Sequence, residues 1–311
     1  MIPFLLLSAT LAADPAPEPV ELKTTNGTIY GGYDIPEGKG PWPIVIVHAG
    51  SGPTDRDGNN PQMKNNSLKM LGEGLREKGF AVLRFDKRGI AASAKSLGKM
   101  EDLRIEHYAN DVVEWVKLIR ADKRFSSIAF IGHSEGSVIG TIAAKEAKFD
   151  AYISLCGPGR GFDVLVVEQV SKDSEELGKK SGEIMAAIAK GEEPKDVPAL
   201  LQALFNKPTR PYVRSMLAHD PARSFGELTC PALIVSGTTD IQVAEADSKA
   251  LAAANPKAKS VRLERMNHIL KEFEKTNKLL QIGSYMDPKL PLHPKLIDSI
   301  SPFLTDSLPA K

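Results

Sequence analysis

The chain has 311 residues, enough for one large α/β domain or two smaller ones. Its hydrophobic fraction of 42% is typical of a globular core and excludes a disordered chain. The formal net charge of +1 gives no basic excess for nucleic acid, and no internal apolar run is long enough to span a membrane.

The N-terminal sequence differs from the rest of the chain. "MIPFLLLSATLAADPAPEPVE" contains an apolar stretch, small residues at Ala12 and Ala13, and then a run rich in Pro and Glu. This order is typical of a secretory signal peptide followed by an extended linker, although no Lys or Arg precedes Lys23. We therefore predict a signal peptide over residues 1–13, a linker over 14–19 and a periplasmic or secreted protein. An apolar strand at the terminus of a cytoplasmic protein is the alternative.

The remaining residues, 20–311, predict one α/β domain. "VELKTTNGTIYGGYDIP" alternates apolar and polar residues around Asn26-Gly27, which predicts a β-hairpin. Short apolar runs then alternate with stretches of helical spacing. These runs are "PIVIVH", "FAVLRF", "SIAFIG", "AYISL", "PALIVSG" and "SVRLERM". Because they are apolar on both faces, they predict buried parallel strands.

The stretches between the runs predict helices that cover the sheet. "HYANDVVEWVKLIRAD" places Val112, Val113, Val116 and Ile119 on one stripe of a helix. A series of strand–helix–strand units favours a mostly parallel, doubly wound sheet with helices on both faces.

The alternation stops between Gly157 and Leu228. This segment has helical periodicity and breaks at "GEEPKDVP" and "NKPTRP". It follows the C-terminal end of a predicted strand, where open α/β sheets bind ligands. We therefore predict that residues 157–228 form a helical cap over the site. A helical insertion remote from the site is the alternative.

The two cysteines are too few for a disulfide framework or a zinc site, and no metal is expected. Cys156 follows "AYISL", whereas Cys230 precedes "PALIVSG". If both runs are parallel strands, the two thiols lie at opposite ends of the sheet and cannot form a disulfide. Both are predicted to be small buried residues.

The segment "FIGHSEGSVIG" contains the strongest functional motif. Gly132-His133-Ser134-Glu135-Gly136 matches G-x-S-x-G, between a predicted strand and a predicted helix. In a nucleophile elbow the serine has strained backbone angles, and its neighbours two positions away must be small. This context predicts that Ser134 is a nucleophile. An inert serine in a glycine-rich turn is the alternative.

A serine nucleophile needs a base, and the base needs an orienting acid. In folds with this elbow the order along the chain is Ser, then Asp or Glu, then His. Asp240 follows the predicted strand "ALIVSG", and His268 follows the next strand, where we expect a helix to begin. We therefore assign His268 as general base and Asp240 as the carboxylate that fixes its tautomer.

Other acids and histidines fit these roles less well. Glu245 and Asp247 fall inside the helix predicted after Asp240, and His293 comes too late to follow a strand. For His133 and His107, solvated or packing roles suffice. His219, at the end of the cap, could enter the pocket, but a surface role is favoured.

The reaction also needs N–H donors for an oxyanion. The predicted strand "PIVIVH" ends at "HAGSG", the position of an oxyanion loop, where small residues let backbone amides approach a substrate. We expect the amide of Ser51, or of Gly50, to act together with the amide of Glu135. A simple glycine turn at the end of a strand is the alternative.

Two charged segments have simpler explanations. "DRDGNN" alternates acids and amides as a calcium loop does, but its glycine is misplaced and Asn66 stands where a bidentate Glu is required, so we reject calcium there. In "FDKRG", a loop-fixing ion pair accounts for Asp86 and Arg88.

Together these segments resemble the α/β-hydrolase superfamily and, more narrowly, EstD-type bacterial carboxylesterases grouped with serine aminopeptidase-like hydrolases. The resemblance rests on "HAGSGPTDRDGNN", "LRFDKRGIAAS", "FIGHSEG", "YVRSMLAHDPA", "VSGTTDIQV" and "MNHILKE". It implies an α/β-hydrolase fold, a triad of Ser134, Asp240 and His268, and hydrolysis of short acyl esters without a cofactor. One departure is Ala91, where related loops often carry Gly.

The expected function is therefore a serine carboxylesterase acting on a small-molecule ester. A serine aminopeptidase or thioesterase with the same triad is the alternative, as is a catalytically inactive binding relative. An aminopeptidase needs an anchor for a free amine, for which the cap offers Glu168, Glu175 and Glu176. The sequence does not indicate an oligomeric state.

Overall fold

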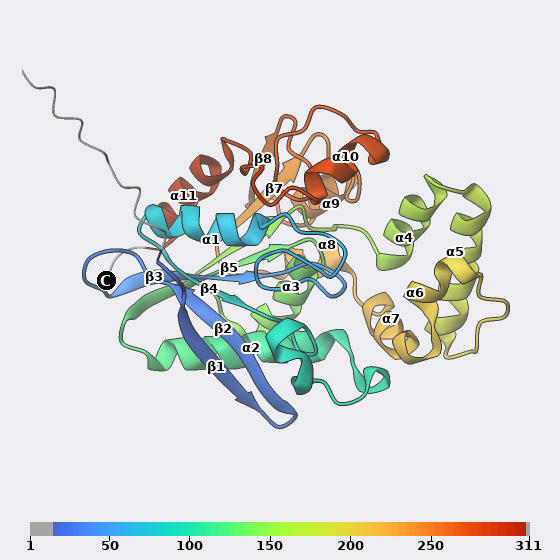
Figure 1. The fold of residues 1–311 in the computed structure, drawn as a ribbon, viewed down its shortest axis with the longest axis horizontal. Helices are drawn as coiled ribbons and strands as arrows, with labels where there is room; N and C mark the ends of the chain where they lie inside the picture. Colours follow the sequence, from blue (N-terminus) through green and yellow to red (C-terminus); the bar gives the residue numbers. More distant parts are fainter. Residues whose placement is uncertain (1–14, 309–311) are drawn as a thin grey trace, which may run out of the picture.

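The computed structural model describes residues 15–308, in which one eight-stranded sheet carries helices on both faces (Figure 1). The strand order is β1-β2-β4-β3-β5-β6-β7-β8. In chain order the strands are β1 Glu18–Thr24, β2 Gly27–Asp34, β3 Trp42–His48, β4 Ala81–Phe85, β5 Phe125–His133, β6 Ala151–Leu155, β7 Ala232–Gly237 and β8 Lys259–Leu263. β3 to β8 pair in parallel, whereas β1 and β2 are antiparallel to their neighbours. The predicted mostly parallel sheet is confirmed.

The N-terminal hairpin is also confirmed, with Thr24 opposite Gly27 across the turn. β1 begins at Glu18, two residues inside the predicted linker, because the residues from Glu18 onward pair with β2. The predicted signal segment, residues 1–13, lies outside the described residues.

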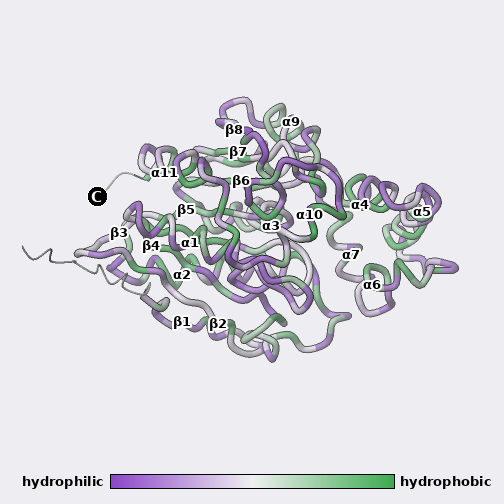
Figure 2. The backbone as a smooth tube through the Cα atoms, turned by 45° about the horizontal axis from the view of Figure 1, so that its top comes forward, coloured by the Kyte–Doolittle hydropathy of each residue, from purple (hydrophilic) through white to green (hydrophobic). Residues whose placement is uncertain are grey.

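Alternate residues of the central strands face two separate cores. On β3, Ile44 and Ile46 pack in one cluster, whereas Val45 and Val47 pack in the other. This alternation follows from the strand period of two, and it explains why the runs are apolar throughout. Figure 2 shows apolar segments through the strands in the middle of the molecule and polar segments in many peripheral loops.

Helices from the strand connections cover the two cores. They are α1 Ser67–Glu77, α2 Ile105–Ala121, α3 Glu135–Ala147, α9 Glu245–Ala254, α10 Lys278–Tyr285 and α11 Leu296–Ser307. The predicted stripe on α2 is buried, as expected for an amphipathic helix. Among residues 15–308, no helix combines the length and the apolar character needed to cross a bilayer.

The chain segment that connects β6 to β7 forms a separate group of helices. This group lies at one end of the molecule (Figure 1). It comprises α4 Phe162–Ser171, α5 Glu175–Lys190, α6 Gln202–Phe205 and α7 Arg210–Leu217, with 3-10 turns at Ala199–Leu201 and Lys207–Thr209. The following helix, α8 Pro221–Gly226, packs against α3 and α9 in the body of the protein. α4 to α7 share their own small core, which includes Val166, Ile184, Phe205 and Val213. We call residues 157–228 the cap.

The two cysteines are free. Cys156 directly follows β6 and Cys230 precedes β7, and because these strands are parallel the thiols lie at opposite ends of the sheet. Cys156 is buried as predicted, but Cys230 is only partly buried.

Candidate active site

Ser134 lies in a sharp turn between β5 and α3. Its backbone has φ 54° and ψ −125°, and its N–H donates to the carbonyl of Leu155 at 2.9 Å. A positive φ at a residue other than glycine is strained, and such strain clusters at functional sites. The predicted strand–turn–helix context of the G-x-S-x-G motif is therefore present.

The two glycines of the motif occupy positions with no room for a side chain. A Cβ on Gly132 would collide with the backbone of Gly136 and Ser137. A Cβ on Gly136 would lie 2.6 Å from the carbonyl oxygen of His48 at the end of β3. Glycine is required at both positions by close backbone approach, as the motif predicts.

Asp240 and His268 come together although 28 residues separate them. The Nδ1 of His268 lies 2.9 Å from Oδ2 of Asp240, and both side chains are buried. Oδ1 of Asp240 accepts the N–H groups of Gln242 at 2.8 Å and Val243 at 2.9 Å. Burial alone would raise the pKa of Asp240, but the positive charge of protonated His268 and these hydrogen bonds together lower it below its usual value.

The loop after β8 carries His268, as predicted, but it is not the start of a helix. Arg265 and Leu270 have φ of 66° and 67°, left-handed values that interrupt a right-handed helix. The side chain of Asn267 accepts the N–H of Lys271 at 3.0 Å and closes the turn. The next helix begins at Lys278.

His133 has a more specific structural role than the packing role expected from the sequence. Its Nε2 donates to the carbonyl oxygen of His268 at 2.8 Å, and the two ring centroids are 4.9 Å apart. Burial lowers the pKa of His133 to about 3, so the ring is neutral at pH 7. Because His133 precedes Ser134, this bond ties the His268 loop to the elbow.

The predicted oxyanion loop lies against the elbow. Gly50 approaches so closely that a Cβ there would be 3.0 Å from the Cβ of Ser134. Ser51 and Glu135 line the same cavity as Ser134. The loop and the residue after the nucleophile therefore border one space, where two backbone amides could meet a developing negative charge.

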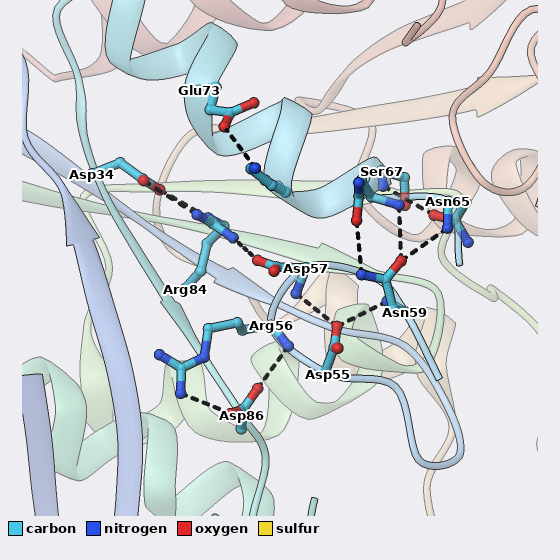
Figure 3. Close-up of polar contacts among 12 residues, drawn as sticks. Asp34, Asp55, Arg56, Asp57, Asn59, Asn65, Ser67, Glu73, Arg84 and Asp86 are labelled. Carbon is cyan, nitrogen blue, oxygen red and sulfur yellow. Dashed lines mark hydrogen bonds and ion pairs between the residues drawn. The ribbon is translucent and has the colours of Figure 1, made fainter. Parts of the chain in front are cut away.

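The polar segment after this loop is held by its own hydrogen bonds (Figure 3). Oδ1 of Asp55 accepts the N–H groups of Asp57 at 2.9 Å and Asn59 at 2.8 Å. Oδ1 of Asn59 accepts those of Asn65 and Asn66. These are Asx-type turns, in which the side chain satisfies the loop backbone.

Asp86 and Arg88 do form ion pairs, but with different partners. Asp86 accepts the backbone N–H of Arg56 at 2.9 Å and its guanidinium at 2.7 Å (Figure 3). Arg88 pairs with Asp111 on α2, where Nε donates at 3.0 Å. Each ion pair thus fixes the loop after β4 to a different neighbouring segment.

Ala91 has the backbone conformation that glycine adopts most easily. Its φ is 44°, at a position where the resemblance noted from the sequence implies glycine. A left-handed residue with a Cβ costs about 1–2 kcal/mol. The hydrogen bond from the Ala92 N–H to Asp86, at 3.2 Å, helps to hold this turn.

A cavity of about 430 Å³ lies over Ser134, between the sheet and the cap. Its walls from the cap are mainly apolar and include Phe162, Leu165, Val166, Leu204, Val213 and Met216. The predicted cap therefore contributes directly to the candidate site.

Two cap residues bind the body of the protein at this cavity. The hydroxyl of Tyr212 donates to Oε1 of Glu135 at 2.6 Å. His219 lines the cavity and its Nε2 lies 2.8 Å from Glu106 on α2, so the favoured surface role for His219 was wrong. A hydrophilic "AHDPA" segment alone could not reveal that α2 lies opposite it.

Cys156, Asp240 and His268 form a group whose possible metal-ligating atoms lie within 4.8 Å of one another. A metal bound through the Nδ1 of His268 and an oxygen of Asp240 would take the groups that the 2.9 Å hydrogen bond joins. Metal binding and the hydrogen bond would therefore compete.

Comparison with known proteins identifies similar sequences. Residues 64–189 match the family model described as serine aminopeptidase, S33. The chain is 30% identical to Esterase EstD of Thermotoga maritima over 240 residues, which cover 75% of this chain and 55% of that protein. The chain thus spans about half the length of this curated relative.

Solved structures share the fold at lower sequence identity. Est1E from Butyrivibrio proteoclasticus matches with a TM-score of 0.61 and 16% identity, over 93% of this chain and 98% of that chain. An esterase of Pyrococcus furiosus matches with a TM-score of 0.59 and 17% identity, over 94% of this chain and 91% of that chain. With its strand order, its elbow and these similarities, the chain has the α/β-hydrolase fold.

Proposed function

We propose that this protein is a serine carboxylesterase that cleaves short acyl esters of small molecules. The observation that carries the proposal is the strained Ser134 at the base of a mainly apolar cavity. The hydrogen-bonded pair of Asp240 and His268 supports it, since His133 ties this pair to the elbow. In this proposal Ser134 is the nucleophile, His268 the general base and Asp240 its orienting carboxylate.

The reaction would proceed in two halves. Ser134 Oγ attacks the ester carbonyl while His268 Nε2 takes its proton, and the amides of Ser51 (or Gly50) and Glu135 stabilise the oxyanion. The carbon–oxygen bond to the alcohol then breaks, and His268 gives the alcohol its proton. Water then attacks the acyl-enzyme while His268 takes its proton; the bond to Ser134 Oγ breaks, the acid leaves, and His268 gives the proton back to Ser134.

The charges around the cavity favour an ester over a peptide with a free amine. Glu168, a candidate amine anchor, is engaged by Arg160 at 2.6 and 2.7 Å. Among the described lining residues the only carboxylate is Glu135, which accepts a hydrogen bond from the hydroxyl of Tyr212, whereas Lys87 and Arg160 are cations. Because Glu168 is paired with Arg160 and Glu135 is engaged by Tyr212, neither carboxylate is free to anchor an ammonium group, while a neutral acyl chain suits the apolar walls.

The similar proteins support the same choice. The relative from Thermotoga maritima and the structural neighbours from Butyrivibrio proteoclasticus and Pyrococcus furiosus include proteins named as esterases. The matched family model carries the name of an aminopeptidase, so amide hydrolysis has to be measured alongside ester hydrolysis.

The test is hydrolysis of p-nitrophenyl esters from acetate to decanoate by the purified protein, with amino-acid p-nitroanilides in parallel. We expect ester turnover with an optimum at short chains and a loss of about 10³-fold or more in Ser134→Ala, since removal of the nucleophile leaves only residual catalysis. Turnover of the anilides alone would instead indicate an aminopeptidase. Equal turnover in both proteins would contradict the proposal.

We also propose that the protein is exported to the periplasm or secreted. The support is the sequence alone: an apolar stretch followed by small residues at Ala12 and Ala13. N-terminal sequencing of the protein recovered from the host cell is expected to begin after Ala13, whereas an intact N-terminus would contradict export with cleavage.

A further inference from the structure

Lys87 is a buried cation next to the candidate oxyanion loop. It follows β4 and is only 1% exposed. Its Nζ donates to the carbonyl oxygens of Gly50 and of Gly52, the latter at 3.0 Å, and lies 5.7 Å from the ring centroid of Tyr108. An ammonium group out of water is costly unless such partners replace its hydration.

The first of these bonds holds the peptide group that contains a proposed oxyanion donor. The carbonyl of Gly50 and the N–H of Ser51 belong to one trans peptide, in which C=O and N–H point in opposite directions. When Lys87 fixes the carbonyl, it also fixes the direction of the Ser51 N–H. The positive charge further polarises the peptide and makes that N–H a stronger donor.

We propose that Lys87 is a positioning residue for the oxyanion hole: its ammonium orients and polarises the Gly50–Ser51 peptide beside Ser134. This inference rests on the proposed function of Ser134 as nucleophile. Lys87 itself does not transfer a proton or contact the reacting carbonyl. Its effect is on the stability of the oxyanion, and hence on kcat more than on KM.

The surroundings of Lys87 give its action a pH dependence. Burial lowers the pKa of Lys87 to about 8, while the negative charge of Glu135 opposes the shift. The other titratable groups near it are Tyr108, whose pKa is raised by burial, and His48 and His133, each with a pKa of about 3 and therefore neutral. The ammonium is thus present at pH 7 and is lost above about pH 8, so kcat should fall on the alkaline side.

The experiment compares kcat and KM for p-nitrophenyl butyrate between pH 6 and 10 in the unmodified protein and in Lys87→Met. At pH 7 we expect kcat of Lys87→Met to be about 10- to 100-fold lower, with KM little changed. This loss does not exceed the loss in kcat that follows removal of a whole oxyanion donor. The decline of kcat above about pH 8, which we call the alkaline limb, should disappear in Lys87→Met. The matched control is Lys95→Met, the same change at an exposed lysine, which should keep both kcat and the limb.

A second variant keeps the proposal testable if Lys87→Met does not fold, as circular dichroism would show. In Glu135→Gln the hydroxyl of Tyr212 keeps an acceptor, but the charge that supports the ammonium is gone. The alkaline limb should therefore move to lower pH.

The outcomes separate this inference from the proposed function. A folded Lys87→Met with unchanged kcat and an unchanged limb overturns the positioning role, as does a limb that Glu135→Gln leaves in place. If Ser134→Ala hydrolyses the ester as fast as the unmodified protein, the proposed function fails instead. Labelling of Ser134 by a fluorophosphonate, read by peptide mass spectrometry, checks this nucleophile independently of either lysine variant.

Discussion

Asp240→Asn is expected to lower kcat for ester hydrolysis by about 10⁴-fold while leaving the fold intact. The reason lies in the two oxygens of Asp240, which have different partners. Oδ1 accepts two backbone N–H groups, from Gln242 and Val243, and Oδ2 accepts from Nδ1 of His268. Asparagine has only one oxygen, and two backbone donors hold it at the Oδ1 position.

The amide nitrogen of the variant would then face His268. An NH₂ group donates, so Nδ1 of His268 must accept and its proton must move to Nε2. A protonated Nε2 cannot take the proton of Ser134, and the base is lost although every atom stays near its place. We therefore expect a large fall in kcat, a small change in KM and slow labelling of Ser134 by a fluorophosphonate.

The control for this measurement is Asp306→Asn, on α11. Asp306 is 70% exposed and lies 3.7 Å from Lys259, so the same change of charge there should leave kcat within about twofold, as is usual for an exposed ion pair. A folded Asp240→Asn protein that loses less than about tenfold in kcat would show that Asp240 does not fix the tautomer of a catalytic histidine.

The parts of the fold that the sequence predicts depend on local pattern. β3 is apolar at every position from Ile44 to Val47 because both of its faces are buried, and this can be read without knowing its neighbours. The elbow is equally local, since Gly132 and Gly136 are required by the turn around Ser134 itself. Asp240 and His268 each follow the end of a predicted parallel strand, and this places both at the same edge of the sheet.

The parts that the sequence does not predict depend on partners far along the chain. His133 binds the carbonyl of a residue 135 positions later, and His219 binds Glu106, 113 positions earlier. Lys87 looks like any charged residue in a loop until its acceptors, Gly50 and Gly52, are seen. Such pairings are set by tertiary packing, so neither charge nor spacing indicates them.

Arg84 is a further case, because a charge inside an apolar strand has no local explanation. It lies on β4 and is 2% exposed, with Nε donating to Asp34 at 2.8 Å and Nη1 donating to Asp57 (Figure 3). Gly72 of α1 leaves room for this pair, since a Cβ there would lie 2.7 Å from Nε of Arg84. One buried cation therefore joins β2, β4 and the polar segment that follows the oxyanion loop.

Arg84→Met should lower the free energy of unfolding by about 3–5 kcal/mol, because it leaves the buried carboxylate of Asp34 without a partner. Urea unfolding measures this loss, and Arg223→Met, at an arginine side chain that is 80% exposed, should cost less than about 1 kcal/mol. Adding Asp34→Leu to Arg84→Met should restore much of the lost stability, since replacing both members of a buried ion pair by apolar groups often leaves the free energy of unfolding unchanged.

If the single variant is as stable as the Arg223→Met control, Asp34 must reach water or another partner when Arg84 is gone. In that case the Asx turns of Asp55 and Asn59, rather than the charge of Arg84, hold the polar segment that follows Ser51.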